Sequence, residues 1–334
     1  MSAAPWREGA VAITAFAVLA GGFFLLIGRG PVDMLMAIVQ AGAGSAYALG
    51  ESLLRATPIL LCALATLVPA RLGLVSVGAE GQLYFGALVG TGMMLFTPQA
   101  SLPGVVMGGM VGGAVWALVP ALLRVVADVN ETISTLMLNY VASLLVTWLV
   151  YGPWKNPQSQ GWPASIDFPD SARLPLLGDS RVHAGLLIAL VVAAVLHALL
   201  TRSRWGLVLD VLRSNPRLAP LAGLNVGRQV LLTMAVGGAL AGLAGIAETA
   251  SVQGRLQASF ANGAGLSGFL VAWLAGNRVL PATVLALLVG ALLAAGDGLQ
   301  MMTDVPSSAV LVVQGLMFVA LLGAGGWRKE AGRV

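Results

Sequence analysis

TRSRWGLVLDVLRSNPRLAPLAGLNVGRQ, residues Thr201–Gln229, is a polar segment between two long apolar runs. Its five arginines are accompanied by a single acid, Asp210, so the segment is too polar to cross a bilayer. An excess of cationic side chains in a short loop is typical of the cytoplasmic side of a membrane. The segment therefore predicts a cytoplasmic loop of 29 residues, on which another protein has room to dock.

The composition of the whole chain agrees with a membrane protein. Of the 334 residues, 58% are apolar and 10% are charged, whereas an ordinary soluble domain has about 25% charged residues. The 43 glycines favour helices that pack closely through small residues, as membrane bundles do. The net charge of +4 follows largely from arginines in cytoplasmic loops and gives no indication of nucleic-acid binding.

Several kinds of chemistry are excluded by residue counts. Cys62 is the only cysteine, so no disulfide forms within the chain. His183 and His197 lie 14 residues apart at opposite ends of one expected span, too far along a helix to share a metal ion. No GxxxxGK[ST] phosphate loop is present. We therefore expect no metal, no cofactor and no enzymatic activity in this chain, and any ATP chemistry would have to occur on a partner.

The apolar runs predict an all-α polytopic membrane bundle of about ten transmembrane helices, with residues 1–334 forming one transmembrane domain. Met34–Glu51 is less apolar than the spans. It is expected to form a helix that lies at the outer surface of the membrane or inserts only halfway into it. The loop 152–182 is rich in prolines and glycines, with balanced charges, and is expected outside. The expected spans are 10–28, 53–70, 83–96, 105–123, 132–151, 183–200, 230–250, a broken span starting near residue 262, 281–302 and 309–323.

Charge counting sets the expected orientation. With both termini cytoplasmic, twelve of the eighteen cationic side chains lie inside, close to the ends of spans. This excess supports the orientation and disfavours its inverse.

Two glycine patterns indicate close packing and internal symmetry. Gly108–Gly113, GGMVGG, contains two overlapping GxxxG spacings in one span. Gly78–Gly90 and Gly263–Gly276 each combine a Gly-Ala start, a polar interruption and an apolar run. They begin spans that are five apart and run in opposite directions, as in an inverted repeat with broken helices around a transport pathway. The alternative is that the two segments share only the high glycine content of the chain.

Polar residues near or within the spans are candidates for that pathway. Glu80 stands at a membrane boundary, where it either faces a polar pathway or serves as a helix-start carboxylate. In the stretch beginning at Asn130, NETISTLMLNY, helix capping explains the first residues but not Asn139, two turns deeper. Asn139 is therefore the strongest candidate. The full set of expected pathway residues is Glu80, Gln82, Asn139, Glu248, Gln253 and Trp273.

Each of these candidates has a structural alternative. Glu248 and Asp297 either line a polar pathway or form hydrogen bonds between helices. Trp273, beside the break in the expected eighth span, either stacks on a substrate ring or packs like other membrane aromatics.

Four segments follow one another in the chain, namely GLVSVGAEGQLYFGALVG, NETISTLMLNYVASLL, NPRLAPLAGLNVGR and GAGLSGFLVAWLAGN. Together they resemble the permease subunits of ABC importers of the branched-chain amino acid, ribose and nucleoside class, and the resemblance extends from about residue 50 to 322. The NETISTLMLNY segment resembles the nucleoside-type permeases most. The cytoplasmic loop departs from the family pattern, with Pro220 in place of an alanine and Leu221 in place of a tyrosine.

The resemblance implies half of a transmembrane pore in a bacterial plasma membrane. Its partners would be a second related permease, two ABC ATPase subunits and an extracytoplasmic substrate-binding protein, besides membrane lipid. Residues 209–224 would be the coupling element for the ATPase. The implied coupling residues are Arg213, Asn215, Pro216, Arg217, Ala219 and Gly223.

The resemblance favours a nucleoside as substrate, followed by simple sugars and riboflavin-like compounds. An ion-coupled secondary transporter using Glu80, Glu248 or Asp297 stays open as another class. A membrane-embedded enzyme is disfavoured because the spans contain no Ser/His/Asp or similar set of residues.

Overall fold

The computed structural model is helical almost throughout. It describes residues 5–97, 100–159, 161–178, 180–214, 219, 223–303 and 305–331, with side chains from 11 to 324 of those. Within these ranges there is no strand, and the β-type pairs are two isolated ones, Ala164 with Gln257 and Leu176 with His183. The predicted all-α fold class is confirmed.

Most helices follow one another with short connections; the longer connections are residues 152–184 between α6 and α7, 215–225 between α8 and α9, and 254–263 between η3 and α10. The long helices are α1 (Pro5–Leu26), α3 (Ala46–Arg71), α4 (Ala79–Phe96), α5 (Leu102–Ala127), α6 (Glu131–Tyr151), α7 (Gly185–Arg202), α9 (Val226–Ala247), α11 (Val279–Thr303) and α12 (Ser308–Ala331). The short ones are α2 (Pro31–Ala43), the 3-10 turn η1 (Asp170–Ala172), α8 (Arg204–Ser214), the π-helical segment η3 (Glu248–Gln253) and α10 (Ala264–Leu274).

Six of the described helices are by themselves long and apolar enough to cross a membrane, namely α3, α5, α6, α7, α9 with η3, and α11. The pair α1 and α2 passes the same test only together and is bent by 110°, which agrees with a first span followed by a segment that does not continue it. The helix α3 begins at Ala46 and ends at Arg71, so it contains the expected second span, 53–70, and extends before it. The expected eighth span is indeed broken, since α10 has only 11 residues.

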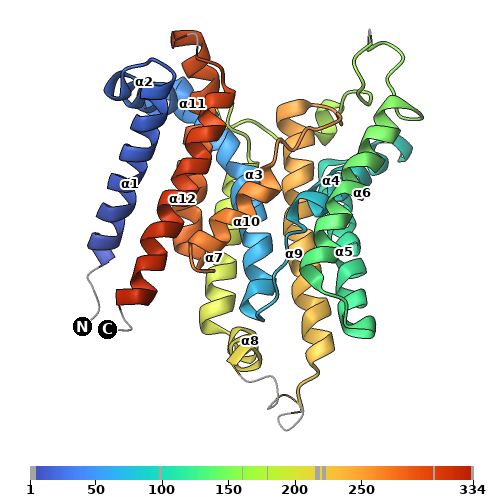
Figure 1. Cartoon of the computed structure of the whole chain (residues 1–334). Coiled ribbons are helices and arrows are strands. Elements are labelled where there is room, and N and C mark those ends of the chain that lie inside the picture. The colour runs from blue at the N-terminus through green and yellow to red at the C-terminus, as the bar shows by residue number, and fades with distance from the viewer. Residues whose placement is uncertain are drawn as a thin grey trace. The chain divides into compact units, whose positions relative to one another are not determined.

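The chain forms two compact units. Unit 1 contains residues 1–56 and 287–334, and unit 2 contains residues 57–286. In unit 1, α1 lies beside α12 (Figure 1), and the two helices share a core that includes Phe24, Val310 and Val313.

In unit 2, α4, α5 and α9 pack side by side through glycines (Figure 1). Gly108 and Gly112 of α5 face α4, whereas Gly109 and Gly113 face α9. A methyl group added at Gly113 would lie only 2.8 Å from the Cα atom of Gly242. The overlapping GxxxG spacings thus serve two neighbouring helices at once, and the three helices form one tightly packed group.

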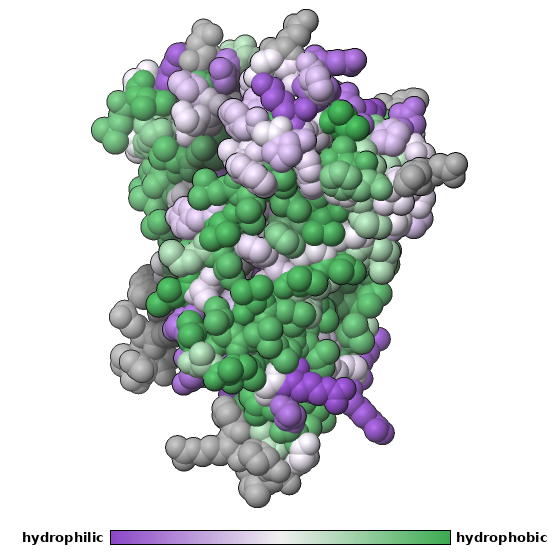
Figure 2. Space-filling view, turned by 90° about the vertical axis from the view of Figure 1, so that its right-hand side faces the viewer, coloured by the Kyte–Doolittle hydropathy of each residue, from purple (hydrophilic) through white to green (hydrophobic). Residues whose placement is uncertain are grey.

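The face of unit 2 that carries α5 and α6 is apolar over its middle, and hydrophilic residues gather toward its two ends (Figure 2). Large apolar side chains on α6 point outward at helical spacing, such as Met137, Leu144 and Trp148. Such a band is typical of a surface that faces lipid or another membrane subunit.

Candidate functional site

The connection between α3 and α4 is held by polar side chains of α6. Its residue Val75 donates its backbone N–H to Glu131 Oε1 at 3.2 Å and accepts a hydrogen bond from Thr132 Oγ1 at 2.9 Å. Asn130 begins α6 and accepts from the backbone N–H groups of Thr132 and Ile133, as its position in the sequence predicts. The start of α6 is therefore both a helix cap and a support for an extended segment of the chain.

The same support continues one and two turns further along α6. Val77 donates its N–H to Thr135 Oγ1 at 3.2 Å, and its carbonyl accepts from Asn139 Nδ2 at 2.9 Å. Asn139 Oδ1 accepts in turn from the N–H of Gly81 at 2.8 Å. Glu131, Thr135 and Asn139 are four residues apart and lie on one helix face. This face of α6 forms hydrogen bonds with the backbone of residues 75–81, as a neighbouring β-strand would do in a sheet.

Glu80, in the first turn of α4, caps the start of another helix. Its Oε2 atom accepts from the backbone N–H groups of Gly265 at 2.6 Å and Leu266 at 3.2 Å, which belong to the first turn of α10. The first N–H groups of a helix lack partners within it and favour negative charge. Glu80 thus joins the first turns of α4 and α10, which begin the two glycine-containing segments of the expected repeat.

Little free space remains where these helices begin. A methyl group at Gly265 would lie 2.7 Å from Glu80 Oε2, and one at Gly78 would lie 3.0 Å from both Gln82 Nε2 and Thr135 Cβ. Gln82 is buried. We call residues 75–82, residues 263–266 and the α6 side chains that hold them the α4/α10 junction. It contains three of the predicted pathway residues, Glu80, Gln82 and Asn139.

The other three predicted pathway residues lie elsewhere. Glu248 and Gln253 are at the two ends of η3, where Gln253 Nε2 donates to Glu248 Oε1 at 3.4 Å. Trp273 is near the last residue of α10, is 45% exposed and contacts Phe269 with ring centroids 5.9 Å apart.

The loop 152–182 is bonded to the segment that leads from η3 toward α10. The backbone N–H of Ser165 donates to the Leu256 carbonyl at 2.9 Å, and its Oγ accepts from the Leu256 N–H at 3.0 Å. Phe168 donates its N–H to the Gly254 carbonyl at 2.8 Å. No sequence signal predicts this contact, because most of its hydrogen bonds use backbone atoms. The side-chain contacts, Trp162 with Gln257, Asp167 with Arg255 and Ser165 with Leu256, follow no motif in the sequence.

Within the arginine-rich loop, the structure places α8 at the end of unit 2 opposite the loop 152–182 (Figure 1). Leu209 and Leu212 are buried, and Leu207 is 66% exposed. Asp210 pairs with Arg71, at the last residue of α3, at 3.2 Å. Trp205 Nε1 donates to Gln229 Oε1, in the first turn of α9, at 3.1 Å. The helix α8 is therefore tied to both α3 and α9.

The predicted coupling residues fall only partly within the described chain. Arg213 is in the last turn of α8, and its Cγ lies 3.7 Å from the place of a methyl group at Gly73. Ala219 is buried and accepts from the N–H of Leu224, and Gly223 has φ of +67°. Asn215, Pro216 and Arg217 lie outside the described residues, as does Pro220.

Comparison with protein-family models identifies the class. Residues 48–322 match the family described as branched-chain amino acid transport system / permease component. The chain belongs to this permease family. The match includes the α4/α10 junction, α8 and the loop 152–182, and it agrees with the resemblance inferred from the four sequence segments. The chain is thus a multi-pass membrane protein and a permease of an ABC importer.

The permease is similar to curated proteins along most of its length. It is 35% identical over 330 residues to a glucose ABC transporter permease of Haloferax volcanii, covering 94% of this chain and 87% of the relative. It is 30% identical over 292 residues to a guanosine ABC transporter permease of Bacillus subtilis, covering 83% and 82%. A nucleoside ABC transporter permease of Lactococcus lactis is 28% identical over 323 residues, covering 92% and 88%.

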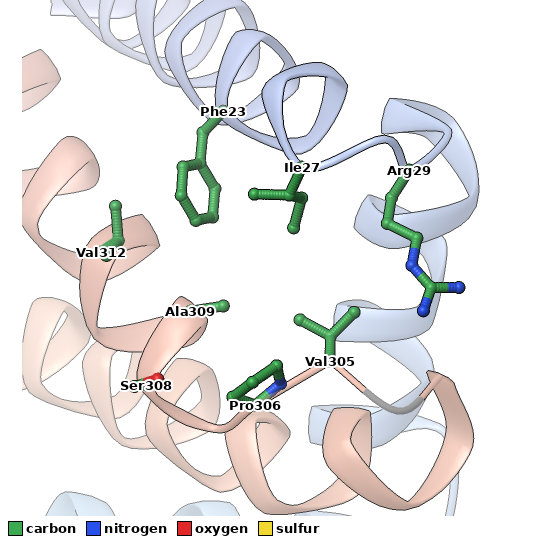
Figure 3. A pocket seen from close by; sticks show the side chains of 8 residues that line it. All are labelled: Phe23, Ile27, Arg29, Val305, Pro306, Ser308, Ala309 and Val312. Atoms are coloured by element: carbon green, nitrogen blue, oxygen red, sulfur yellow. The ribbon is translucent and has the colours of Figure 1, made fainter.

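Unit 1 of the permease contains a second set of polar contacts and a small hollow. Arg55 of α3 pairs with Asp297 of α11 at 2.7 Å, so Asp297 bonds between helices, as the alternative interpretation predicts. The hollow lies between the end of α1 and the start of α12 (Figure 3). Its lining is mostly apolar, with Arg29 at its edge, and includes none of the predicted pathway residues.

Proposed function

We propose that the chain is the permease subunit of an ATP-driven importer for nucleosides. The observation that supports this proposal most is the similarity of the chain to two permeases. One is named for guanosine and matches 83% of the chain, and the other is named for nucleosides and matches 92%. The NETISTLMLNY segment, which suggested a nucleoside-type permease from sequence, supplies the α6 side chains of the α4/α10 junction.

The proposed complex contains this chain, a second related permease, ABC ATPase subunits and an extracytoplasmic binding protein. A nucleoside released by the binding protein would enter between the two permeases, and no covalent chemistry would occur on this chain. The apolar outer face of α6 supports a surface toward lipid or the second permease.

The α4/α10 junction is the proposed polar part of the pathway. Discontinuous helices whose first turns meet near the membrane centre commonly hold substrate in transporters. Here Glu80 and Asn139 satisfy backbone groups, so we assign them the role of shaping the junction. Gln82 beside them, together with Glu248, Gln253 and Trp273, remains a proposed contact with the substrate.

The carboxylates Glu80 and Asp297 are engaged in a helix cap and an ion pair, which favours ATP-driven over ion-coupled transport.

Coupling would proceed through α8. The ATPase would press on the exposed side of α8, which includes Leu207. The Arg71–Asp210 and Trp205–Gln229 contacts would pass this movement to α3 and α9. Because α9 has no free space against α4 and α5, the three helices would move together.

The proposed location is the bacterial plasma membrane, with both termini and α8 cytoplasmic and the loop 152–182 outside. The excess of arginine in the α8 loop supports this orientation. Single cysteines placed at Gly178 and at Gly223, in a Cys62→Ser background, test it by labelling intact cells with an impermeant thiol reagent. Labelling at Gly178 alone is expected, and labelling at Gly223 alone would reverse the topology.

Glucose is the second candidate substrate, because the chain is 35% identical over 330 residues to the glucose ABC transporter permease of Haloferax volcanii. Melting shifts of the cognate binding protein with guanosine, other nucleosides, glucose and riboflavin would separate these candidates. A shift with nucleosides at micromolar concentration is expected. A shift with glucose alone would replace the nucleoside assignment, and a response only to an amino acid would exclude both.

A further inference from the structure

We propose that Ser165 is a positioning residue through which a partner bound on the loop 152–182 acts on the start of α10. This inference rests on the proposed function, in which a binding protein docks outside. The residue belongs to neither the pathway nor the coupling helix. Its role would be to hold the segment 254–257 in register with the loop.

Ser165 makes a reciprocal contact with Leu256. The backbone N–H of Ser165 donates to the Leu256 carbonyl at 2.9 Å, and the Leu256 N–H donates to Ser165 Oγ at 3.0 Å. Both residues are fully buried. Their neighbours Ala164 and Gln257 form an isolated antiparallel pair. The hydroxyl oxygen thus takes the place of a strand carbonyl and satisfies a buried N–H group that would otherwise cost free energy.

Further bonds fix the loop beside this point, and most of them use backbone atoms. Phe168 N–H donates to the Gly254 carbonyl at 2.8 Å, and Leu174 N–H donates to the Ala250 carbonyl at 3.1 Å. Asp167 lies 3.8 Å from Arg255 in a partly exposed ion pair. Because substitutions do not remove backbone bonds, Ser165 is the buried side chain through which the contact can be weakened selectively.

The other end of the same segment is attached to the α4/α10 junction. Phe260 packs edge-on against Tyr84 of α4, with ring centroids 5.0 Å apart. Gly265 and Leu266 then donate to Glu80. About ten residues of chain therefore separate a contact to the outer loop from a contact to the junction. A displacement of the loop is carried to the start of α10 because both ends of this short segment are held.

The test compares Ser165→Ala with Ser159→Ala in the reconstituted complex with its ATPase and binding protein. Ser159 lies in the same loop, and its hydroxyl bonds only to the loop itself, at Asn156 and Trp162. For Ser165→Ala, the maximal stimulation of ATP hydrolysis by loaded binding protein is expected to fall by about fivefold, because the substitution removes the acceptor for the Leu256 N–H and also the local bond that Ser165 Oγ donates to the Ile166 carbonyl. Basal hydrolysis and the half-saturating concentration of binding protein should stay unchanged, since the loop surface is intact.

A purely structural role would instead lower basal hydrolysis and stimulation together, or weaken binding, and would overturn the proposal. Equal stimulation in wild type, Ser165→Ala and Ser159→Ala would overturn it as well. If the wild-type complex shows no ATP-dependent uptake and no stimulation, the proposed function fails, and this inference fails with it.

A disulfide provides a second test if Ser165→Ala folds poorly. Ser165 and Leu256 stand next to the antiparallel pair Ala164 and Gln257. Facing residues of antiparallel segments have Cα atoms about 4.5–5.5 Å apart, within the range of a disulfide. The double variant Ser165→Cys with Leu256→Cys, in a Cys62→Ser background, should show low stimulation when reduced and regain it when oxidised. Stimulation that is no higher after oxidation would contradict a positioning role.

Discussion

The Glu80 carboxylate lies 2.6 Å from the backbone nitrogen of Gly265, a residue 185 positions later in the chain, and thereby joins the first turns of α4 and α10. One side chain thus connects the two segments in which a polar interruption precedes an apolar run.

Removal of this cap should destabilise the junction. Glu80→Ala is expected to cost about 1 kcal/mol, the usual effect of losing a helix N-cap, and to reduce uptake. Glu80→Gln keeps an acceptor but removes the charge that favours a helix start, so its cost should be smaller. Thermal melting and uptake of both variants check this order. Equal melting temperatures for Ala and wild type would contradict the capping role.

Asn139 should tolerate no replacement that lacks either half of its amide. Asn139→Asp keeps an acceptor for Gly81 N–H but leaves the Val77 carbonyl without its donor, at a cost of about 1–3 kcal/mol for a buried polar group. Asn139→Leu loses both bonds and should be worse. Ser143→Ala is the control on the same helix, because its hydroxyl bonds only to the helix itself, at Tyr140. The melting temperature should fall in the order Ser143→Ala, Asn139→Asp, Asn139→Leu.

The sequence predicted which polar residues of α6 are unusual, but not what they contact. Asn139 was singled out because capping does not explain it, and its partners lie about 60 residues earlier in an extended segment without its own hydrogen-bond pattern. For Glu80, the interpretation as a helix-start carboxylate is confirmed in part. The carboxylate accepts hydrogen bonds from first-turn N–H groups, but these belong to α10 and not to its own helix α4. Hydrophobic runs locate spans, whereas contacts between broken ends depend on the tertiary fold.

Boundaries were less predictable where a helix continues through polar residues. The helix α3 includes Glu51 and Ser52, and Ser52 Oγ donates to the Gly42 carbonyl at 2.6 Å. A polar side chain with such a partner does not end a helix, although it weakens the hydropathy signal. The helix α8 spans Arg204–Ser214 and buries Gly206, Leu209 and Leu212, so the predicted coupling element, residues 209–224, begins within this helix.

The close packing of α5 on α9 should make Gly113 sensitive to one added methyl group. Gly113→Ala would place that group against the backbone of α9 and is expected to cost about 1–3 kcal/mol, as overpacking does. Gly104→Ala is the matched control in α5, because its nearest contact there would be Ser101 Oγ at 3.5 Å. Thermal melting in detergent should separate the two. A loss in Gly104→Ala as large as in Gly113→Ala would contradict this explanation.

His183 lies between the loop 152–182 and α7, and it should make the end of this loop sensitive to acid. Burial lowers the pKa of His183 to about 4 from its ordinary value near 6.5, and its Nδ1 accepts from the N–H of Gly185. The unfolded loop therefore takes up a proton as the pH falls from 6.5 toward 4, while the folded loop does not. The contribution of neutral His183 to the free energy of unfolding is therefore fully present above pH 6.5. It declines as the pH falls from 6.5 to 4, by about 3 kcal/mol at most.

Hydrogen exchange of residues 175–184 between pH 7 and pH 4.5 measures this effect. His183→Gln should reduce its pH dependence, and His197→Gln is the control at the other histidine. The same pH dependence in His183→Gln and wild type would assign it to other groups.

Gly223 provides the last prediction, which concerns coupling. Its φ of +67° lies in the left-handed region, whereas proline is fixed near −65°, so Gly223→Pro must change the turn that leads into α9. A methyl group there would meet no atom of the described residues within 4 Å, so no crowding against them is expected. Membrane insertion and assembly should persist, while substrate-stimulated ATP hydrolysis falls several-fold. Gly178→Pro, at φ of +61° in the opposite loop, is the control for backbone strain alone. Unchanged stimulation in Gly223→Pro would show that this turn does not transmit the movement of α8 to α9.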